Sequence, residues 1–97
     1  MLDKFTTREE LVELGMKPNA IEAFLKLQYL GCPVRIPIYG DDRGHFWIDA
    51  EQYGSGEWLD YYSNDLFWGS DTLNTILDEH ELYWEWYNSA YANVYDA

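Results

Sequence analysis

The stretch DTLNTILDEHELYWEWYNSAYANVYD, residues 71–96, decides what fold the C-terminal part of this chain adopts. On a helical wheel of 100° per residue, its apolar residues share one broad face and its acids share the opposite face. The apolar face comprises Leu73, Ile76, Leu77, His80, Trp84, Tyr87, Tyr91 and Val94, and the acidic face comprises Asp71, Asp78, Glu81, Glu85 and Asp96. This pattern predicts a long acidic amphipathic helix that begins at an Asp71 N-cap.

A strand is the alternative for residues 81–95. Leu82, Trp84 and Trp86 alternate with Tyr83, Glu85 and Tyr87, and aromatic residues favour strands. We favour the helix for this segment because the wheel separates acids from apolar residues over its whole length.

Upstream of this segment, two short helices are expected. Thr7 and Glu10 have the spacing of a capping box, which predicts the start of a first helix that ends at Gly15. Pro18 suits the first turn of a second helix, and apolar residues then recur at helical spacing as far as Gly31.

A β-hairpin is expected after the helix pair. Apolar residues alternate over 34–39, residues 40–44 have the composition of a turn, and 45–49 form the returning strand. Pro37 cannot donate to a sheet ladder, which favours an edge position for the first strand. Residues 1–97 are thus predicted to form one α+β domain with an N-terminal helix pair, a central β-hairpin and a C-terminal acidic helix.

Charge is distributed unevenly along the chain, whose formal net charge is −12. Residues 1–43 hold all six Lys and Arg residues and have a net charge of −1, whereas residues 44–97 hold eleven acids, no Lys or Arg and all five Trp residues. An acidic tail poor in aromatic residues would be disordered, so this composition instead predicts an acidic surface on a folded aromatic core. Direct binding to nucleic acid or to an anionic membrane is not expected, because like charges would meet.

Several other functional classes are also not expected. Residues 1–6 lack the features of a secretory signal, and no stretch is long and apolar enough for a membrane span, so the chain is expected to be cytoplasmic. Cys32 is the single cysteine, which excludes an internal disulfide and favours a small buried hydrophobe. The spacing of acids and histidines fits no EF-hand or zinc site, and no nucleophile or phosphate-loop motif occurs. We therefore predict no catalytic, metal or cofactor site and no enzymatic activity.

The acids on the predicted helix, together with those just before it, are the best candidates for binding a partner. They lack interleaved Lys residues, so the usual i to i+4 ion pairs are missing. Leu82 and Trp86 lie at the edge of the same wheel face and are candidate apolar anchors. The expected partner-binding residues are Glu57, Asp60, Asp65, Asp71, Asp78, Glu81, Leu82, Glu85 and Trp86.

The small size, the absence of Lys and Arg after Arg43 and the run DEHELYWEWY at residues 78–87 resemble the acidic DNA-mimic proteins that phages use against host defence. These include anti-CRISPR proteins, antirestriction proteins and inhibitors of uracil-DNA glycosylase, and the resemblance is greatest to the anti-CRISPR group. It implies an inhibitor that acts in the bacterial host cell by covering the basic DNA-binding surface of a complex such as a CRISPR effector. The alternative is an acidic adaptor or regulatory module that binds a protein without competing with DNA.

Overall fold

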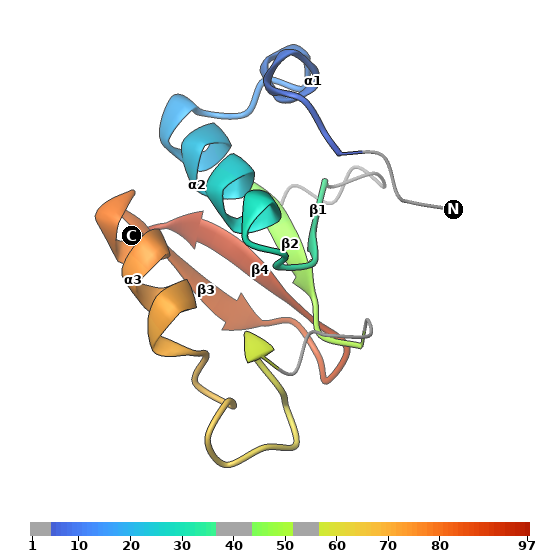
Figure 1. The fold of residues 1–97 in the computed structure, drawn as a ribbon, viewed down its shortest axis with the longest axis vertical. Helices are drawn as coiled ribbons and strands as arrows, with labels where there is room; N and C mark the ends of the chain where they lie inside the picture. Colours follow the sequence, from blue (N-terminus) through green and yellow to red (C-terminus); the bar gives the residue numbers. More distant parts are fainter. Residues whose placement is uncertain (1–4, 37–43, 52–56) are drawn as a thin grey trace.

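The computed structural model describes residues 5–36, 44–51 and 57–97 (Figure 1). Its helices are α1 (Arg8–Glu13), α2 (Pro18–Tyr29) and α3 (Asp71–Glu79). Its strands are β1 (Val34–Arg35), β2 (Phe46–Asp49), β3 (Leu82–Trp86) and β4 (Tyr91–Asp96). The predicted α+β class is therefore confirmed.

The N-terminal helix pair forms as predicted. Thr7 caps α1 in a capping box with Glu10, whose side chain in turn accepts from the Thr7 backbone N–H at 3.2 Å. Pro18 occupies the first turn of α2, where its fixed φ and missing N–H carry no penalty. The buried face of α2 includes Phe24 and Leu27, which are fully shielded from solvent.

The predicted hairpin, with strands over 34–39 and 45–49, is matched in part by β1 and β2. β1 and β2 are antiparallel, with Val34 opposite Ile48 and Arg35 opposite Trp47. Among the strands of the described residues, β1 has a single neighbour and is an edge strand, as expected for the segment that precedes Pro37. Pro37 itself and most of the predicted turn lie outside the described residues.

The prediction of one helix over residues 71–96 is wrong. α3 ends at Glu79, Glu81 adopts a left-handed φ of 60°, and β3 and β4 follow as an antiparallel pair. The alternation of Leu82, Trp84 and Trp86 with exposed neighbours is the period that strands require. As strands, β3 and β4 can each bury a row of apolar side chains on the same face of the sheet. The free energy of that packing outweighs the helical pattern of the same residues.

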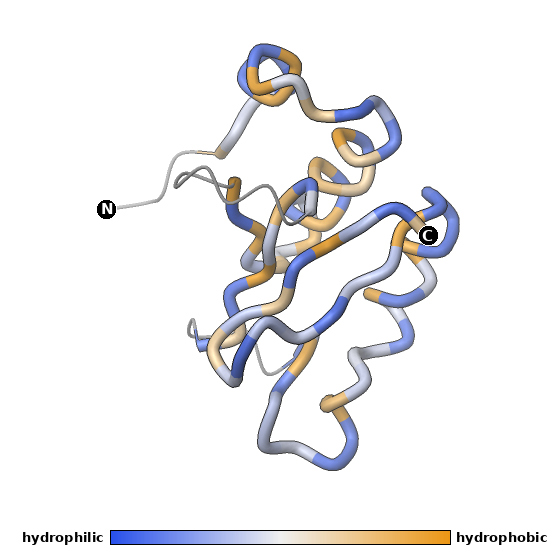
Figure 2. Tube along the Cα trace, turned by 180° about the vertical axis from the view of Figure 1, so that it is seen from behind, coloured by the Kyte–Doolittle hydropathy of each residue, from blue (hydrophilic) through white to orange (hydrophobic). Residues whose placement is uncertain are grey.

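The four strands form one antiparallel sheet in the order β1-β2-β4-β3 (Figure 1). Helices α2 and α3 cover one face (Figure 1), and hydrophobic and hydrophilic positions are interspersed along the trace (Figure 2). The ring of Phe46 on β2 meets the ring of Phe24 on α2 edge-to-face at 5.1 Å. On the other face, Tyr83 and Tyr95 are cross-strand neighbours in register, and no helix of the described residues covers them.

The end of β4 is tied to the helical layer by Asp96. Its carboxylate oxygens lie 2.8 Å from Lys17 Nζ and 2.8 Å from His45 Nε2. These two contacts hold the pKa of Asp96 below its ordinary value of 3.8. A carboxyl group whose pKa is lowered by folding stabilises the protein above its unfolded pKa, and this contribution disappears as the pH falls through the folded pKa.

Asp96→Asn is therefore expected to be less stable than the wild type at pH values above about 5, with the difference shrinking as the pH falls below the ordinary value of 3.8. Urea unfolding at a series of pH values measures the difference. Glu51→Gln is the control, because Glu51 is exposed and makes no ion pair within the described residues. A wild-type advantage that stays constant with pH would contradict the role of Asp96.

Candidate binding surface

Helix α3 presents acids to solvent while its other face is buried in the core. Ser70 caps the helix by accepting from the Leu73 N–H at 3.2 Å. Leu73, Ile76 and Leu77 are buried, whereas Asp71 and Asp78 are exposed. The predicted amphipathic pattern is thus confirmed for residues 71–79, although the helix is shorter than expected.

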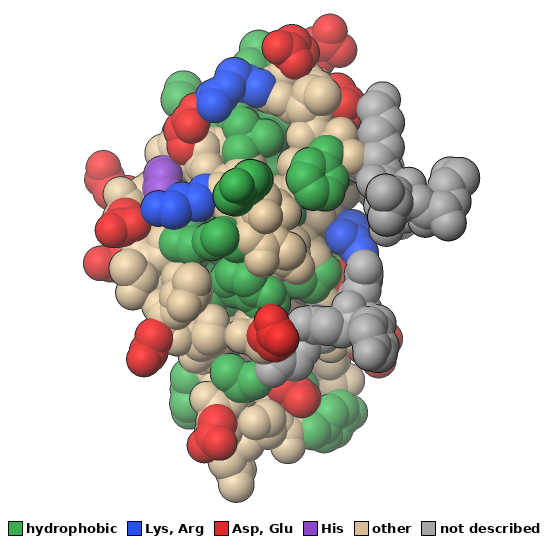
Figure 3. All heavy atoms as spheres, viewed as in Figure 1, with side chains coloured by type: hydrophobic (Ala, Val, Ile, Leu, Met, Phe, Trp, Pro, Cys, Tyr) green, Lys and Arg blue, Asp and Glu red, His purple; other side chains and the backbone are tan. Residues whose placement is uncertain are grey.

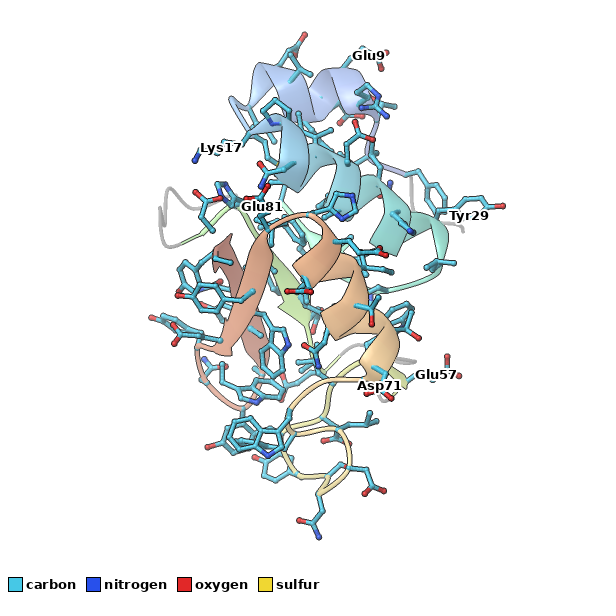
Figure 4. The ribbon with its side chains drawn as sticks, turned by 90° about the vertical axis from the view of Figure 1, so that its left-hand side faces the viewer. Glu9, Lys17, Tyr29, Glu57, Asp71 and Glu81 are labelled. Carbon is cyan, nitrogen blue, oxygen red and sulfur yellow. The ribbon has the colours of Figure 1, made fainter. Side chains whose placement is uncertain are left out.

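The exposed acids near α3 extend beyond the helix itself. Figure 4 shows Asp71 at the first turn of α3, Glu81 just past its opposite end and Glu57 beside Asp71. We call Glu57, Asp71, Asp78 and Glu81 the acidic ridge; all four are exposed. In the lower half of Figure 3, acidic side chains are spread over the surface, and no Lys or Arg of the described residues is visible there.

The segment that leads into α3 carries the other two predicted acids. Asp65 is exposed, but Asp60 is half-buried and its carboxylate accepts from the Tyr62 N–H at 3.0 Å. The segment is fixed by buried Trp58, whose carbonyl accepts from Ser70 N at 2.8 Å. Asp65 therefore belongs to the exposed acids that precede the ridge, whereas Asp60 shapes the backbone of the turn.

Three acids of the C-terminal half are compensated by upstream cations. Asp96 contacts Lys17 and His45, Asp49 Oδ2 lies 3.9 Å from Arg35 Nη2, and Glu79 Oε1 lies 3.8 Å from Lys26 Nζ. Within the described residues, the four ridge acids, Asp65 and Glu85 make no ion pair with any Lys, Arg or His. The ridge side of the molecule is consequently a source of uncompensated negative potential.

The predicted partner-binding residues of β3 lie on opposite faces of the sheet. Leu82 and Trp86 face α3 and the core, and Glu85 faces the other way. Leu82 is 3% exposed, so its predicted placement at the edge of an acidic helix face is wrong and it is not an anchor. Glu85 is exposed but lies outside the ridge.

Trp86 is mainly a structural residue. It is half-buried, its Nε1 donates to the Phe67 carbonyl at 2.8 Å, and its ring lies edge-to-face against Tyr61 at 5.3 Å. The helical reasoning that made it an anchor is wrong for the same reason as for Leu82, because residues 82–86 form a strand. Its ring instead attaches the 57–70 segment to the sheet.

An aromatic network that the sequence reasoning missed holds this segment in place. Trp84 Nε1 donates to Asn74 Oδ1 at 2.9 Å, and Asn74 Nδ2 donates to the Trp68 carbonyl at 2.9 Å. The Trp84 and Trp86 rings are perpendicular at 5.2 Å. Asn74 therefore links α3, β3 and the preceding segment, a role that a helical wheel cannot reveal because the partners belong to three elements.

Gly69 lies directly against this network. Its φ is +83°, and a Cβ placed there would lie 3.0 Å from atoms of the Trp84 ring. Gly15 has a similar φ of +80°, but a Cβ placed there would meet nothing within 4 Å.

Gly69→Ala is expected to destabilise the protein by more than Gly15→Ala, which itself costs about 1–2 kcal/mol for the left-handed backbone. Urea unfolding of both variants measures the difference in the free energy of unfolding. Equal losses of stability in the two variants would show that the Trp84 ring can move aside without cost.

A groove runs between α3 and the free edge of β3. One hollow of about 640 Å³ includes Phe67, Trp68, Asn74 and residues 83–86 in its lining. A second hollow of about 620 Å³ is lined by Asp71, Asn74, Thr75, Leu77, Asp78, Leu82 and Tyr83. Because the two hollows share Asn74 and Tyr83, we treat them as one feature, the edge groove. Trp68 stands at one end with 74% of its surface exposed.

Thiol and metal chemistry can be considered from the buried cysteine and from the placement of possible metal ligands. Cys32 is buried as predicted, and burial raises the pKa of its thiol to about 12, which disfavours the nucleophilic thiolate. No group of three or more His, Cys, Asp or Glu side chains within the described ranges is placed to share a metal ion. Among the same residues, no helix is long and apolar enough to cross a membrane.

Comparison with protein-family models, with curated proteins and with solved structures finds no match for this chain. Its function therefore has to be inferred from the acidic ridge, the edge groove and the elements that hold them.

Proposed function

We propose that this protein is a non-enzymatic DNA-mimic inhibitor that covers the basic DNA-binding surface of a bacterial defence complex, such as a CRISPR effector. The observation that carries the proposal is the acidic ridge, whose exposed carboxylates have no cationic partner within the described residues. A surface that binds DNA through Lys and Arg would attract the same carboxylates.

The spacing of the ridge acids supports substitution for phosphates. Asp71 and Asp78 are seven residues apart on α3, so they lie on nearly the same side of the helix and are separated by a rise of about 10 Å. Three base-pair steps of one DNA strand rise by about 10 Å as well. Glu81 and Glu57 place further negative charge at the two ends of this row (Figure 4).

The way in which the ridge is held also favours a binding role. Eleven acids without an interleaved cation in residues 44–97 repel one another and lower stability. Burial of α3 through Leu73, Ile76 and Leu77 offsets that repulsion and fixes the backbone that carries Asp71 and Asp78. Rigid acids lose less conformational entropy on binding than acids on a mobile tail.

The test is competition with DNA. The tagged protein is incubated at low salt with a lysate of a bacterium that carries a defence system, with and without excess duplex DNA, and the captured complex is then purified for direct titration. We expect capture of a DNA-binding complex that duplex DNA displaces, with an affinity that falls between about 50 and 200 mM salt as screening increases. An affinity unchanged by both salt and DNA would contradict charge mimicry.

A second candidate is an acidic adaptor that binds its partner without DNA competition. The edge groove and the exposed Trp68 favour this candidate, because an aromatic ring that is 74% exposed beside a groove is a typical protein contact. The adaptor predicts that Trp68→Ala weakens partner binding and that duplex DNA does not displace the partner, whereas the DNA mimic predicts displacement by DNA from both wild type and Trp68→Ala.

A further inference from the structure

The edge groove combines an open strand edge with acidic walls. The Tyr87 N–H donates to the Tyr91 carbonyl, and the Ala97 N–H donates to the Glu81 carbonyl. With the β3–β4 register, these bonds show that odd-numbered residues direct their backbone groups toward β4. The even-numbered residues of β3 therefore direct N–H and C=O groups toward the groove; they are Leu82, Trp84 and Trp86.

These edge groups are available for another strand. Within the described residues, no backbone or side-chain group bonds to the N–H or C=O of those three residues on the groove side. Strand edges of this kind are usually blocked by a charge, a proline or a bulge; β3 contains no proline, and its one charged residue is Glu85. Recognition by strand addition uses such an edge together with flanking side-chain pockets.

The groove selects for positive charge. Asp71 and Asp78 line its α3 side, Glu85 contributes to the lining at its opposite end, and no Lys, Arg or His from the described part of the chain is among its lining residues. At that end the lining includes Trp68, Trp84 and Trp86, and indole faces attract a guanidinium or ammonium group. A second copy of this chain is a poor occupant, because each carries a net charge of −12.

We propose that the edge groove binds an extended basic peptide segment of a partner protein, which adds to β3 as an antiparallel or parallel strand and places an Arg or Lys side chain beside Trp68. This inference goes beyond the proposed function, since strand addition at β3 neither requires nor excludes competition with DNA. The ridge and the groove are adjacent, however, because Asp71 and Asp78 belong to both.

The probe is a capped octapeptide of alternating Val and Arg, titrated at low salt into the ¹⁵N-labelled full chain and followed by NMR. We expect saturable shifts of the Leu82, Trp84 and Trp86 amide signals and of the Trp68 indole signal. A Val-Glu octapeptide is expected not to bind, and N-methylation of alternate peptide bonds is expected to weaken binding at least tenfold. Equal binding of the N-methylated peptide, or no binding at millimolar concentration, would overturn strand addition.

Two variants separate the groove from general charge attraction. Trp68→Ala is expected to weaken peptide binding about tenfold, whereas Tyr62→Ala, at a residue that is 82% exposed and outside the groove lining, is expected to leave it unchanged. Equal effects of the two variants would overturn the assignment. Concentration-dependent shifts of the same amides without peptide, together with a dimer in sedimentation, would show that a second copy occupies the edge and would also overturn it.

These outcomes are distinguishable from those of the competition test. Duplex DNA that displaces a captured complex from both wild type and Trp68→Ala supports the inhibitor whatever the peptide does. Peptide binding without any displacement by DNA supports the groove and contradicts the inhibitor.

Discussion

Replacing Leu82 with Ala is expected to lower the free energy of unfolding by about 2–5 kcal/mol, because it removes buried methyl groups and leaves a cavity. Leu82 is 3% exposed and belongs to the core beneath α3. This loss is a large share of the roughly 5–15 kcal/mol that a typical domain has in total. Urea unfolding followed by Trp fluorescence and by circular dichroism measures it.

Tyr83→Ala is the matched control, since Tyr83 is the next residue of β3 but faces away from the helices with 43% of its surface exposed. It is expected to cost about 1 kcal/mol or less, through its cross-strand pair with Tyr95. The folded Leu82→Ala protein is expected to keep its affinity for the partner. If Leu82→Ala keeps the full stability of the wild type but loses partner binding, Leu82 is instead an exposed anchor, as the helical wheel predicts.

Reversing two charges on the ridge, with Asp71→Lys and Asp78→Lys together, is expected to reduce the rate of association with a DNA-binding partner by roughly 10- to 1000-fold at low salt, the range that electrostatic steering supplies. The effect is expected to shrink as salt is raised, because exposed charges are screened over about 8–10 Å. Stopped-flow mixing at a series of salt concentrations gives the rate.

The control is Glu9→Lys with Glu13→Lys. These two residues are exposed on α1, and Figure 4 shows Glu9 at the top of the molecule, far from Asp71 in its lower part. Both double variants change the net charge by the same amount, so a similar loss in the two would show that total charge and not the ridge controls association. The stability of the ridge variant is expected to change by about 1 kcal/mol at most, from a cation at the start of α3.

The local signals in the sequence predicted the N-terminal half well. The Thr7–Glu10 capping box and Pro18 act within one turn of chain, so their outcome depends little on the rest of the fold. The strand alternation that begins at Val34 and returns through Ile48 likewise matches the observed pairing. These features are decided by neighbours in sequence.

The C-terminal half was decided by neighbours in space. Residues 82–96 satisfy a helical period and a strand period at once, and the choice depends on β4 pairing with β2, which lies more than forty residues earlier. No periodicity within the segment contains that information. The same limit explains why the exposed acids of α3 could be predicted, whereas the edge groove, which needs Trp68, Asn74 and β3 together, could not.

The place of β4 in the sheet order β1-β2-β4-β3 has a consequence for biosynthesis. The last strand of the described residues in chain order is also an inner strand, and it supplies the pairing partner for both β2 and β3. While the chain is still being made, β2 has only two-residue β1 beside it, which is too little for a stable sheet. We therefore expect the sheet to fold as a unit only after residues 91–96 have left the ribosome. Before that point the nascent chain gains little stability from sheet pairing.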